Sequence, residues 1–152
     1  MTVADEIFED RMTQAGVALR NADFVGLLEQ RQAALERLLE ARRQLTEAKR
    51  LHTDAKERQD AVALDAIYAL DWDPAFKWGS NKEIRDRQAE KYLRAHGPWR
   101  VAETERKAAL RGVERAADEE RRAEAAVEHL GLMIGARRSE LDLLASFARG
   151  AS

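Results

Sequence analysis

Cysteine is absent from the 152 residues of this chain, so it can form no disulfide, thiolate metal site or thiol nucleophile. Aromatic residues make up only 6% of it, and of the 68 hydrophobic residues (45%) 28 are alanine. Because alanine buries little apolar area, the large side chains are too few for a thick globular core. They fit narrow seams between helices. We therefore expect a single elongated helical domain, residues 1–152, that associates with further copies to bury more surface.

The chain also lacks a strong excess of either charge and any long apolar run. A net charge of −2 and a pI near 6.0 argue against a uniformly basic protein that coats nucleic acid. No apolar run approaches the roughly 20 residues that span a bilayer, and the acidic N-terminal sequence contains no apolar signal segment. We expect no membrane contact and a cytoplasmic location.

Patterns typical of catalysis and metal binding are missing as well. His52, His96 and His129 share no i,i+4 partner, and none follows a glutamate by three residues, as the Glu-x-x-His motif of di-iron bundles requires. No serine lies in a G-x-S-x-G turn, and there is no glycine-rich phosphate loop. We predict no enzyme activity, no cofactor, no metal site and no small-molecule substrate.

Two long runs without internal proline dominate what is present. They predict long helices over 23–70 and 98–148, with apolar or small residues alternately three and four apart, as in a coiled coil. Residues 1–22 are predicted to form an N-terminal helix or arm before them. The first seam is Phe24, Leu28, Leu35, Leu38, Leu45, Ala48, His52, Ala55, Gln59, Val62, Ala66 and Leu70. The second is Ala109, Val113, Ala116, Glu120, Ala123, Val127, Leu130, Ile134, Arg137, Leu141, Leu144 and Ala148.

The two seams predict a long antiparallel helical hairpin. When the chain is folded back on itself, the residue numbers of facing seam positions add up to 171 or 172, which we call the index sum. Residues of similar size then lie opposite each other. His52 then falls opposite Glu120, and we expect these two side chains to pair. Parallel self-pairing of each long helix is the alternative that heptads alone do not exclude. The expected pairs are Leu28 with Leu144, Leu38 with Ile134, Leu45 with Val127, Ala48 with Ala123, Ala55 with Ala116 and Val62 with Ala109.

The segment that joins the long helices, residues 71–97, is an aromatic head. Asp73 precedes Pro74, which disfavours helical backbone at Asp73 and ends the first helix. Ser80 matches the S-x-x-E capping pattern and Asn81 is the alternative cap, so we predict a short helix over 82–96. Gly97 is expected to stop that helix and Pro98 to begin the next.

The head also carries a family resemblance. Gly79-x-Asn81-x-x-x-Arg85, between two long helices rich in alanine and glutamate, resembles the Gly-x-Asn-x-x-x-Arg turn motif of a class of small helical-hairpin proteins from bacteriophages and prophages. The similarity covers the layout of the whole chain. It implies a phage or prophage setting, with some members from genome regions for DNA recombination and replication, and a location in the bacterial host. It implies no catalytic residue.

The head is a candidate binding surface. Seven cations and three carboxylates between Lys77 and Arg100 give a local charge of +4, with aromatic residues interleaved. Cations beside aromatic faces suit single-stranded nucleic acid, and they also suit another phage or host protein. The simpler alternative is that the aromatics only pack together and close the hairpin. The candidates are Lys77, Trp78, Lys82, Arg85, Arg87, Lys91, Tyr92, Arg94, Trp99 and Arg100.

A second candidate surface, for self-association, lies in the last third of the chain. Some of its large apolar residues fall off the predicted seam, and Gly131 and Gly135 would let another helix approach closely. The candidates are Val127, Leu130, Leu132, Met133, Leu143 and Phe147. We predict a non-catalytic interaction or scaffold protein that forms a dimer or larger helical bundle. A nucleic-acid-associated accessory protein is the alternative.

Overall fold

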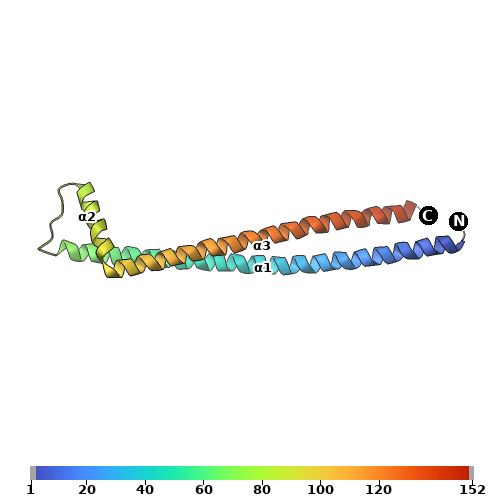
Figure 1. The fold of residues 1–152 in the computed structure, drawn as a ribbon, viewed down its shortest axis with the longest axis horizontal. Helices are drawn as coiled ribbons and strands as arrows, with labels where there is room; N and C mark the ends of the chain where they lie inside the picture. Colours follow the sequence, from blue (N-terminus) through green and yellow to red (C-terminus); the bar gives the residue numbers. More distant parts are fainter. Residues whose placement is uncertain (1–2, 151–152) are drawn as a thin grey trace. The chain divides into compact units, whose positions relative to one another are not determined.

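The computed structural model describes the backbone of residues 3–150 and the side chains of residues 14, 16–18 and 21–150. Three helices make up most of it: α1 (Val3–Asp71), α2 (Lys82–Ala95) and α3 (Gly97–Gly150) (Figure 1). No strand is present in the described backbone. The predicted all-α class, with a short helix in the head, is confirmed.

The chain divides into two compact units, each of which pairs α1 with α3. We call Met1–Ala41 with Glu120–Ser152 the terminal unit, and Arg42–Glu119 the head unit. In each unit a segment of α1 runs beside a segment of α3 (Figure 1). Because the chain reverses direction in the head, the paired segments are antiparallel. The predicted hairpin is therefore confirmed.

The N-terminal residues do not form a helix of their own. Residues 3–22 belong to α1, which continues without a break to Asp71, so the boundary predicted at 22–23 is absent. Asn21 and Asp23, residue types that often cap helices, lie inside α1. Such residues cost less than about 1 kcal/mol each against alanine, and glycine about 1 kcal/mol, whereas an interior proline costs about 3 kcal/mol. No proline occurs before Pro74, and the helix continues.

The predicted seams are largely confirmed by burial. On α3, every predicted position from Ala109 to Leu144 is at least partly buried, and Ala102 extends the seam toward the head. On α1, Leu28 is 42% exposed, and its neighbour Leu27 is buried in its place. Ala41 is also buried and fills the long step between Leu38 and Leu45. The alternation of three and four residues is therefore more regular than predicted. Ala148 is exposed, so the seam of α3 ends before it.

The register predicted for the head unit is wrong by about one heptad. A groove on one side of the seam is lined by four residues from each helix. Its lining spans residues 58–65 of α1 and 98–105 of α3, so the residue numbers of facing positions sum to about 163, whereas Val62 was predicted opposite Ala109, at a sum of 171. The full lining is Arg58, Ala61, Val62, Asp65, Pro98, Val101, Ala102 and Glu105.

The cause of this shift is the packing of α2. A second groove is lined by Ile67 and Asp71 at the end of α1 together with residues of the loop and of α2. The last turn of α1 therefore packs against α2. The start of α3 then lies beside residues of α1 that come about one heptad earlier in the sequence than predicted. Because a seam with a seven-residue repeat looks the same after a shift of seven, apolar spacing alone cannot detect this offset.

His52 is the polar residue for which the prediction fails most clearly. It lies on the seam, partly buried, and its Nε2 atom is enclosed without a hydrogen-bond partner. The pairing expected with Glu120 is therefore not made through this atom. An enclosed polar atom without a partner costs about 1–3 kcal/mol, so His52 weakens the seam.

The exposed surface of α1 carries a small network of charges around Arg50. Its Nε and Nη2 atoms donate to both carboxylate oxygens of Glu47 at 2.9 and 2.7 Å, and Nη1 donates to Asp54 at 2.9 Å. The hydrogen bond from Arg50 lowers the pKa of the Glu47 carboxyl. Glu47 and then Asp54 raise the pKa of Arg50. Because these groups are exposed, they contribute little to stability.

Candidate interaction surfaces

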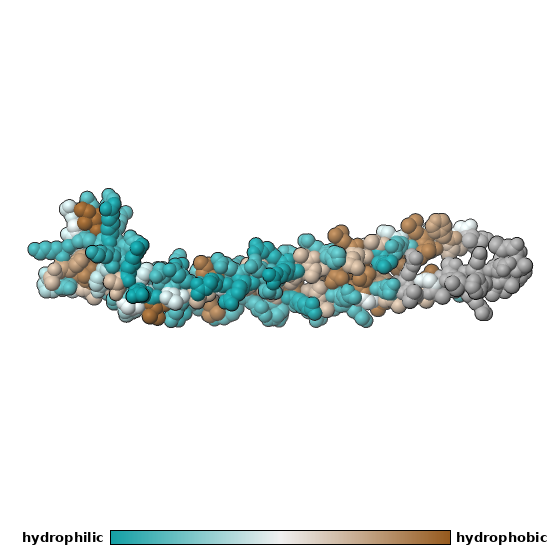
Figure 2. Space-filling view, in the orientation of Figure 1, coloured by the Kyte–Doolittle hydropathy of each residue, from teal (hydrophilic) through white to brown (hydrophobic). Residues whose placement is uncertain are grey.

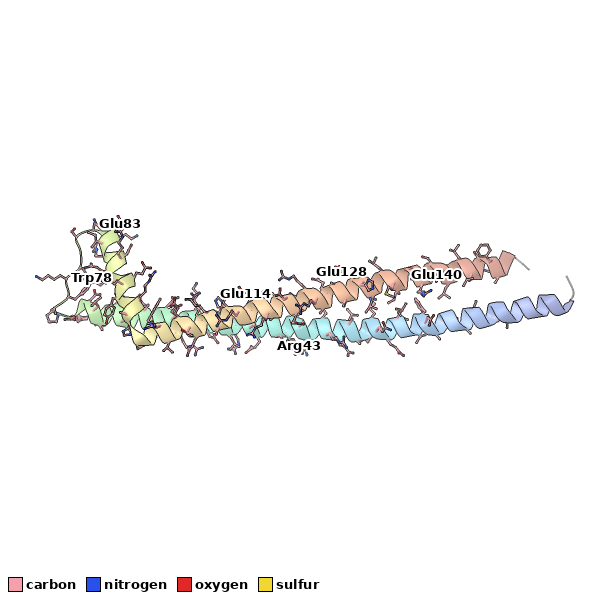
Figure 3. The ribbon with its side chains drawn as sticks, viewed as in Figure 1. Arg43, Trp78, Glu83, Glu114, Glu128 and Glu140 are labelled. Carbon is pink, nitrogen blue, oxygen red and sulfur yellow. The ribbon has the colours of Figure 1, made fainter. Side chains whose placement is uncertain are left out.

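The loop between α1 and α2 is ordered by hydrogen bonds to aspartate. The backbone N–H of Asp73 donates to the Leu70 carbonyl at 3.1 Å, which closes the end of α1. The carboxylate of Asp73 then accepts the N–H of Ala75 at 2.9 Å, as an aspartate does in an Asx turn. The indole N–H of Trp78 donates to Asp71 at 2.6 Å (Figure 3). These contacts hold the loop against the last turn of α1.

Gly79 is held between Gln88 and Ile84 of α2. The Gln88 amide accepts the N–H of Gly79 at 2.8 Å and donates to the Lys77 carbonyl at 3.1 Å. A Cβ atom at position 79 would lie 2.2 Å from Ile84 Cγ2, which is well inside van der Waals contact. Glycine is therefore required here by close approach of the loop to α2.

The other two motif residues begin α2. Asn81 is the N-cap, and its side-chain oxygen accepts the N–H of Ile84 at 2.9 Å, so the structure selects Asn81 over Ser80. Arg85 donates to the Asn81 carbonyl from its backbone N–H at 3.2 Å and from Nε at 3.4 Å. Within this chain, all three residues of Gly79-x-Asn81-x-x-x-Arg85 build the turn.

The break between α2 and α3 lies at His96, one residue before the glycine predicted to cause it. His96 has extended backbone, with φ −80° and ψ 113°, and caps α2 through a hydrogen bond from its N–H to the Leu93 carbonyl. Its own carbonyl accepts the N–H of Arg100 at 3.1 Å and so begins α3. Gly97 has negative φ and is the first residue of α3. The His96 ring stacks on Tyr92, with centroids 5.8 Å apart.

The three aromatic residues proposed for stacking on bases are partly buried. Trp78 packs edge-on against Phe76 with ring centroids 5.0 Å apart, and Tyr92 and Trp99 are partly buried as well. Packing of this kind is what the simpler alternative, closure of the hairpin, requires.

Two further aromatic residues near the head, neither of them among the predicted binding candidates, are exposed. Trp72 is 74% exposed and Tyr68 65%, with ring centroids 6.1 Å apart. Leu64, 72% exposed, lies one turn before them. The spacing of four residues, off the seam of α1, was the available signal for this exposed row.

The cations of the head differ in whether a carboxylate neutralises them. Arg87 pairs with Glu83 at 2.6 Å, and Arg94 pairs with Glu90 at 2.5 Å, each one turn apart on α2. Five other candidate cations form no ion pair with any described residue: Lys77, Lys82, Arg85, Lys91 and Arg100. The unpaired charge of the head is therefore spread over the loop, α2 and the start of α3.

In the terminal unit, α3 carries a second set of residues in heptad spacing besides its seam. At 100° per residue, this set lies about 160° around the helix from the seam, on the side turned away from α1. We call it the outer stripe, and every member is exposed. Figure 2 shows hydrophobic side chains gathered over the C-terminal half of α3. The outer stripe consists of Ala125, His129, Leu132, Ala136, Ser139, Leu143 and Ser146.

The candidates for self-association divide between the two sides of α3. Val127 and Leu130 lie on the seam and are partly buried. Leu132 and Leu143 belong to the outer stripe, with exposed fractions of 75% and 59%. Met133 and Phe147, exposed by 40% and 73%, flank the stripe. No atom lies within 4 Å of a Cβ built at Gly131 or Gly135, so no described contact requires these glycines.

Two negative findings concern the described residues only. No group of three or more His, Asp or Glu side chains in this part of the chain is placed to hold a metal ion. No helix within the described residues has a stretch apolar enough to span a membrane.

The chain was also compared with known proteins. No family model, curated protein or solved structure matches it.

Proposed function

We propose that this chain is a non-catalytic helical interaction protein that self-associates through the outer stripe of α3. The observation that carries the proposal is the exposure of Leu132 and Leu143 in heptad spacing on the side of α3 turned away from α1. A heptad stripe is the surface that a further helix covers in a coiled coil.

Burial of the outer stripe would favour association. Full burial of a leucine side chain contributes about 1.5–3 kcal/mol, and a pair of chains would bury four such leucines. Phe147, 73% exposed at the edge of the stripe, adds aromatic area. Contiguous exposed apolar surface of this kind is typical of a protein–protein contact.

Thermal unfolding at two protein concentrations tests the proposal. Association stabilises the folded state by mass action, so the Tm of the unchanged chain should rise with concentration. Leu132→Gln should abolish most of that rise. Leu64→Gln is the matched control, because Leu64 is 72% exposed in the head unit and Leu132 75% exposed in the terminal unit. A Tm independent of concentration in the unchanged chain, or equal effects of the two substitutions, would contradict the proposal.

A second candidate function is binding of nucleic acid by the head. It is supported by the five cations that form no ion pair with described residues: Lys77, Lys82, Arg85, Lys91 and Arg100. The test is a salt titration with single-stranded DNA, in which Lys82→Ala with Lys91→Ala should weaken binding and reduce its salt dependence. Arg87→Ala with Arg94→Ala removes cations that carboxylates already neutralise, so this variant should weaken DNA binding less. Absence of binding at low salt would remove this candidate.

The proposed setting is a phage or prophage. It is supported by the resemblance of Gly79-x-Asn81-x-x-x-Arg85 alone. The head residues that hold this motif together serve the turn of the hairpin, and self-association is assigned to the opposite end of α3.

A further inference from the structure

We infer that the partner on the outer stripe is the α3 helix of a second copy, in antiparallel orientation about a two-fold axis between residues 137 and 138. This inference rests on the proposed self-association and specifies its geometry. A two-fold contact must be complementary to itself, so the same stripe has to fit in reverse order. The heptad spacing of the outer stripe allows several such registers, and one of them matches residue size and charge.

In that register, facing residues of the two copies have index sums of 275. Leu132 of one copy faces Leu143 of the other, and the symmetry repeats this layer, so two leucine–leucine layers form. Between them, Ala136 faces Ser139, and these small residues allow the helices to approach closely. At both ends His129 faces Ser146, which keeps polar side chains at the border of the apolar contact. The contact spans residues 125–150, roughly 35–40 Å of helix.

The charges beside the stripe agree with the same register. In an antiparallel coiled coil the residues just before the first core position of each heptad face one another across the seam. Here those flanking residues are Glu128, Gly135, Asp142 and Arg149. Glu128, marked on α3 in Figure 3, would face Arg149 of the second copy, and the two-fold axis makes this opposite-charge contact twice.

Shifts of one heptad are disfavoured by charge. In one direction Glu128 would face Asp142 of the second copy, and in the other the two Asp142 side chains would face each other. Both bring like charges together, which opposes association. A parallel pairing would place His129 on His129 and would leave Glu128 beside Met133, with no opposite-charge contact. Of these pairings, the register with an index sum of 275 is therefore the one in which facing residues both match in size and carry opposite charges.

Disulfide formation between engineered cysteines tests this geometry, since the chain contains no cysteine of its own. The variants are His129→Cys and Ser146→Cys, one with a tag that changes its size on a gel. They are unfolded together, refolded and oxidised. The expected product is a disulfide-linked dimer containing one copy of each variant. Each variant alone should remain uncrosslinked, because its two cysteines would lie about 25 Å apart along the helices.

The possible results of this experiment test the antiparallel register separately from self-association. Crosslinking of His129→Cys alone would show a parallel pair and overturn the inference. No crosslink in the mixture, with a molar mass in solution still twice that of the chain, would overturn this register and leave the proposed self-association standing. A monomeric mass for the unchanged chain would overturn both.

Discussion

The backbone of Gly79 lies so close to Ile84 that a Cβ atom at residue 79 would stand 2.2 Å from Ile84 Cγ2 and 2.8 Å from Ile84 Cβ. Gly79→Ala should therefore push α2 away from the loop and strain the Gly79–Gln88 hydrogen bond. Overpacking of this kind costs about 1–3 kcal/mol. Urea unfolding, followed by circular dichroism, should show a lower midpoint for Gly79→Ala.

Gly112→Ala is the matched control and should have the opposite effect. A Cβ at residue 112 of α3 would meet no atom within 4 Å. Alanine in a helix interior is favoured over glycine by about 1 kcal/mol, so this variant should be more stable. Equal effects of the two substitutions would contradict the packing of α2 described above.

Asn81→Ala should destabilise α2 by removing its cap. The side chain of Asn81 accepts the Ile84 N–H at 2.9 Å, and loss of such a cap costs about 0.5–2 kcal/mol. Ser80→Ala is the control and should change stability little, although Ser80 also fits a capping pattern. Hydrogen exchange of the first amides of α2 distinguishes the two variants. Faster exchange in Ser80→Ala than in Asn81→Ala would show that the cap is misassigned.

His52→Leu should stabilise the head unit. The enclosed Nε2 atom of His52 has no hydrogen-bond partner, and an apolar side chain on the seam removes that penalty of about 1–3 kcal/mol. Lys56→Leu, at an exposed position on the same helix, should stay within about 0.5 kcal/mol of the unchanged chain. Denaturant midpoints measure both. A loss of stability in His52→Leu would indicate a hydrogen bond that the structure does not contain.

Tryptophan fluorescence should separate the exposed Trp72 from the partly buried Trp78. Trp72 is 74% exposed, so Trp72→Phe should shift the emission to shorter wavelength and reduce quenching by acrylamide. Trp78→Phe should keep the exposed component and lose the hydrogen bond to Asp71. Stronger quenching after Trp72→Phe would contradict this assignment of exposed and buried rings.

Apolar spacing predicts the seams of this chain well because each seam is a local property of one helix. Positions from Ala109 to Leu144 follow from steps of three and four alone, and all are at least partly buried. The register between helices is not local. It depends on how many residues of α1 are covered by α2, and the contact of Ile67 and Asp71 with α2 shifts it by about one heptad. Any shift by seven keeps the apolar pattern intact.

In the candidate surfaces, too, features set by neighbouring residues in the sequence were predictable, and features set by tertiary packing were not. The cap at Asn81 follows from side-chain chemistry and was among the predicted alternatives. The need for glycine at Gly79 depends on the approach of Ile84, which no sequence spacing indicates. Composition also drew attention to Trp78, whereas exposure selects Tyr68 and Trp72, because burial is decided by packing in three dimensions.

The proposed self-association requires that a second copy of the chain covers the outer stripe of α3. The most direct test is the molar mass of the unchanged chain, measured by light scattering over a range of concentrations. At tens of micromolar the mass should approach twice the chain mass of 17.2 kDa, and it should fall toward 17.2 kDa on dilution. A mass of 17.2 kDa at every concentration would contradict the account.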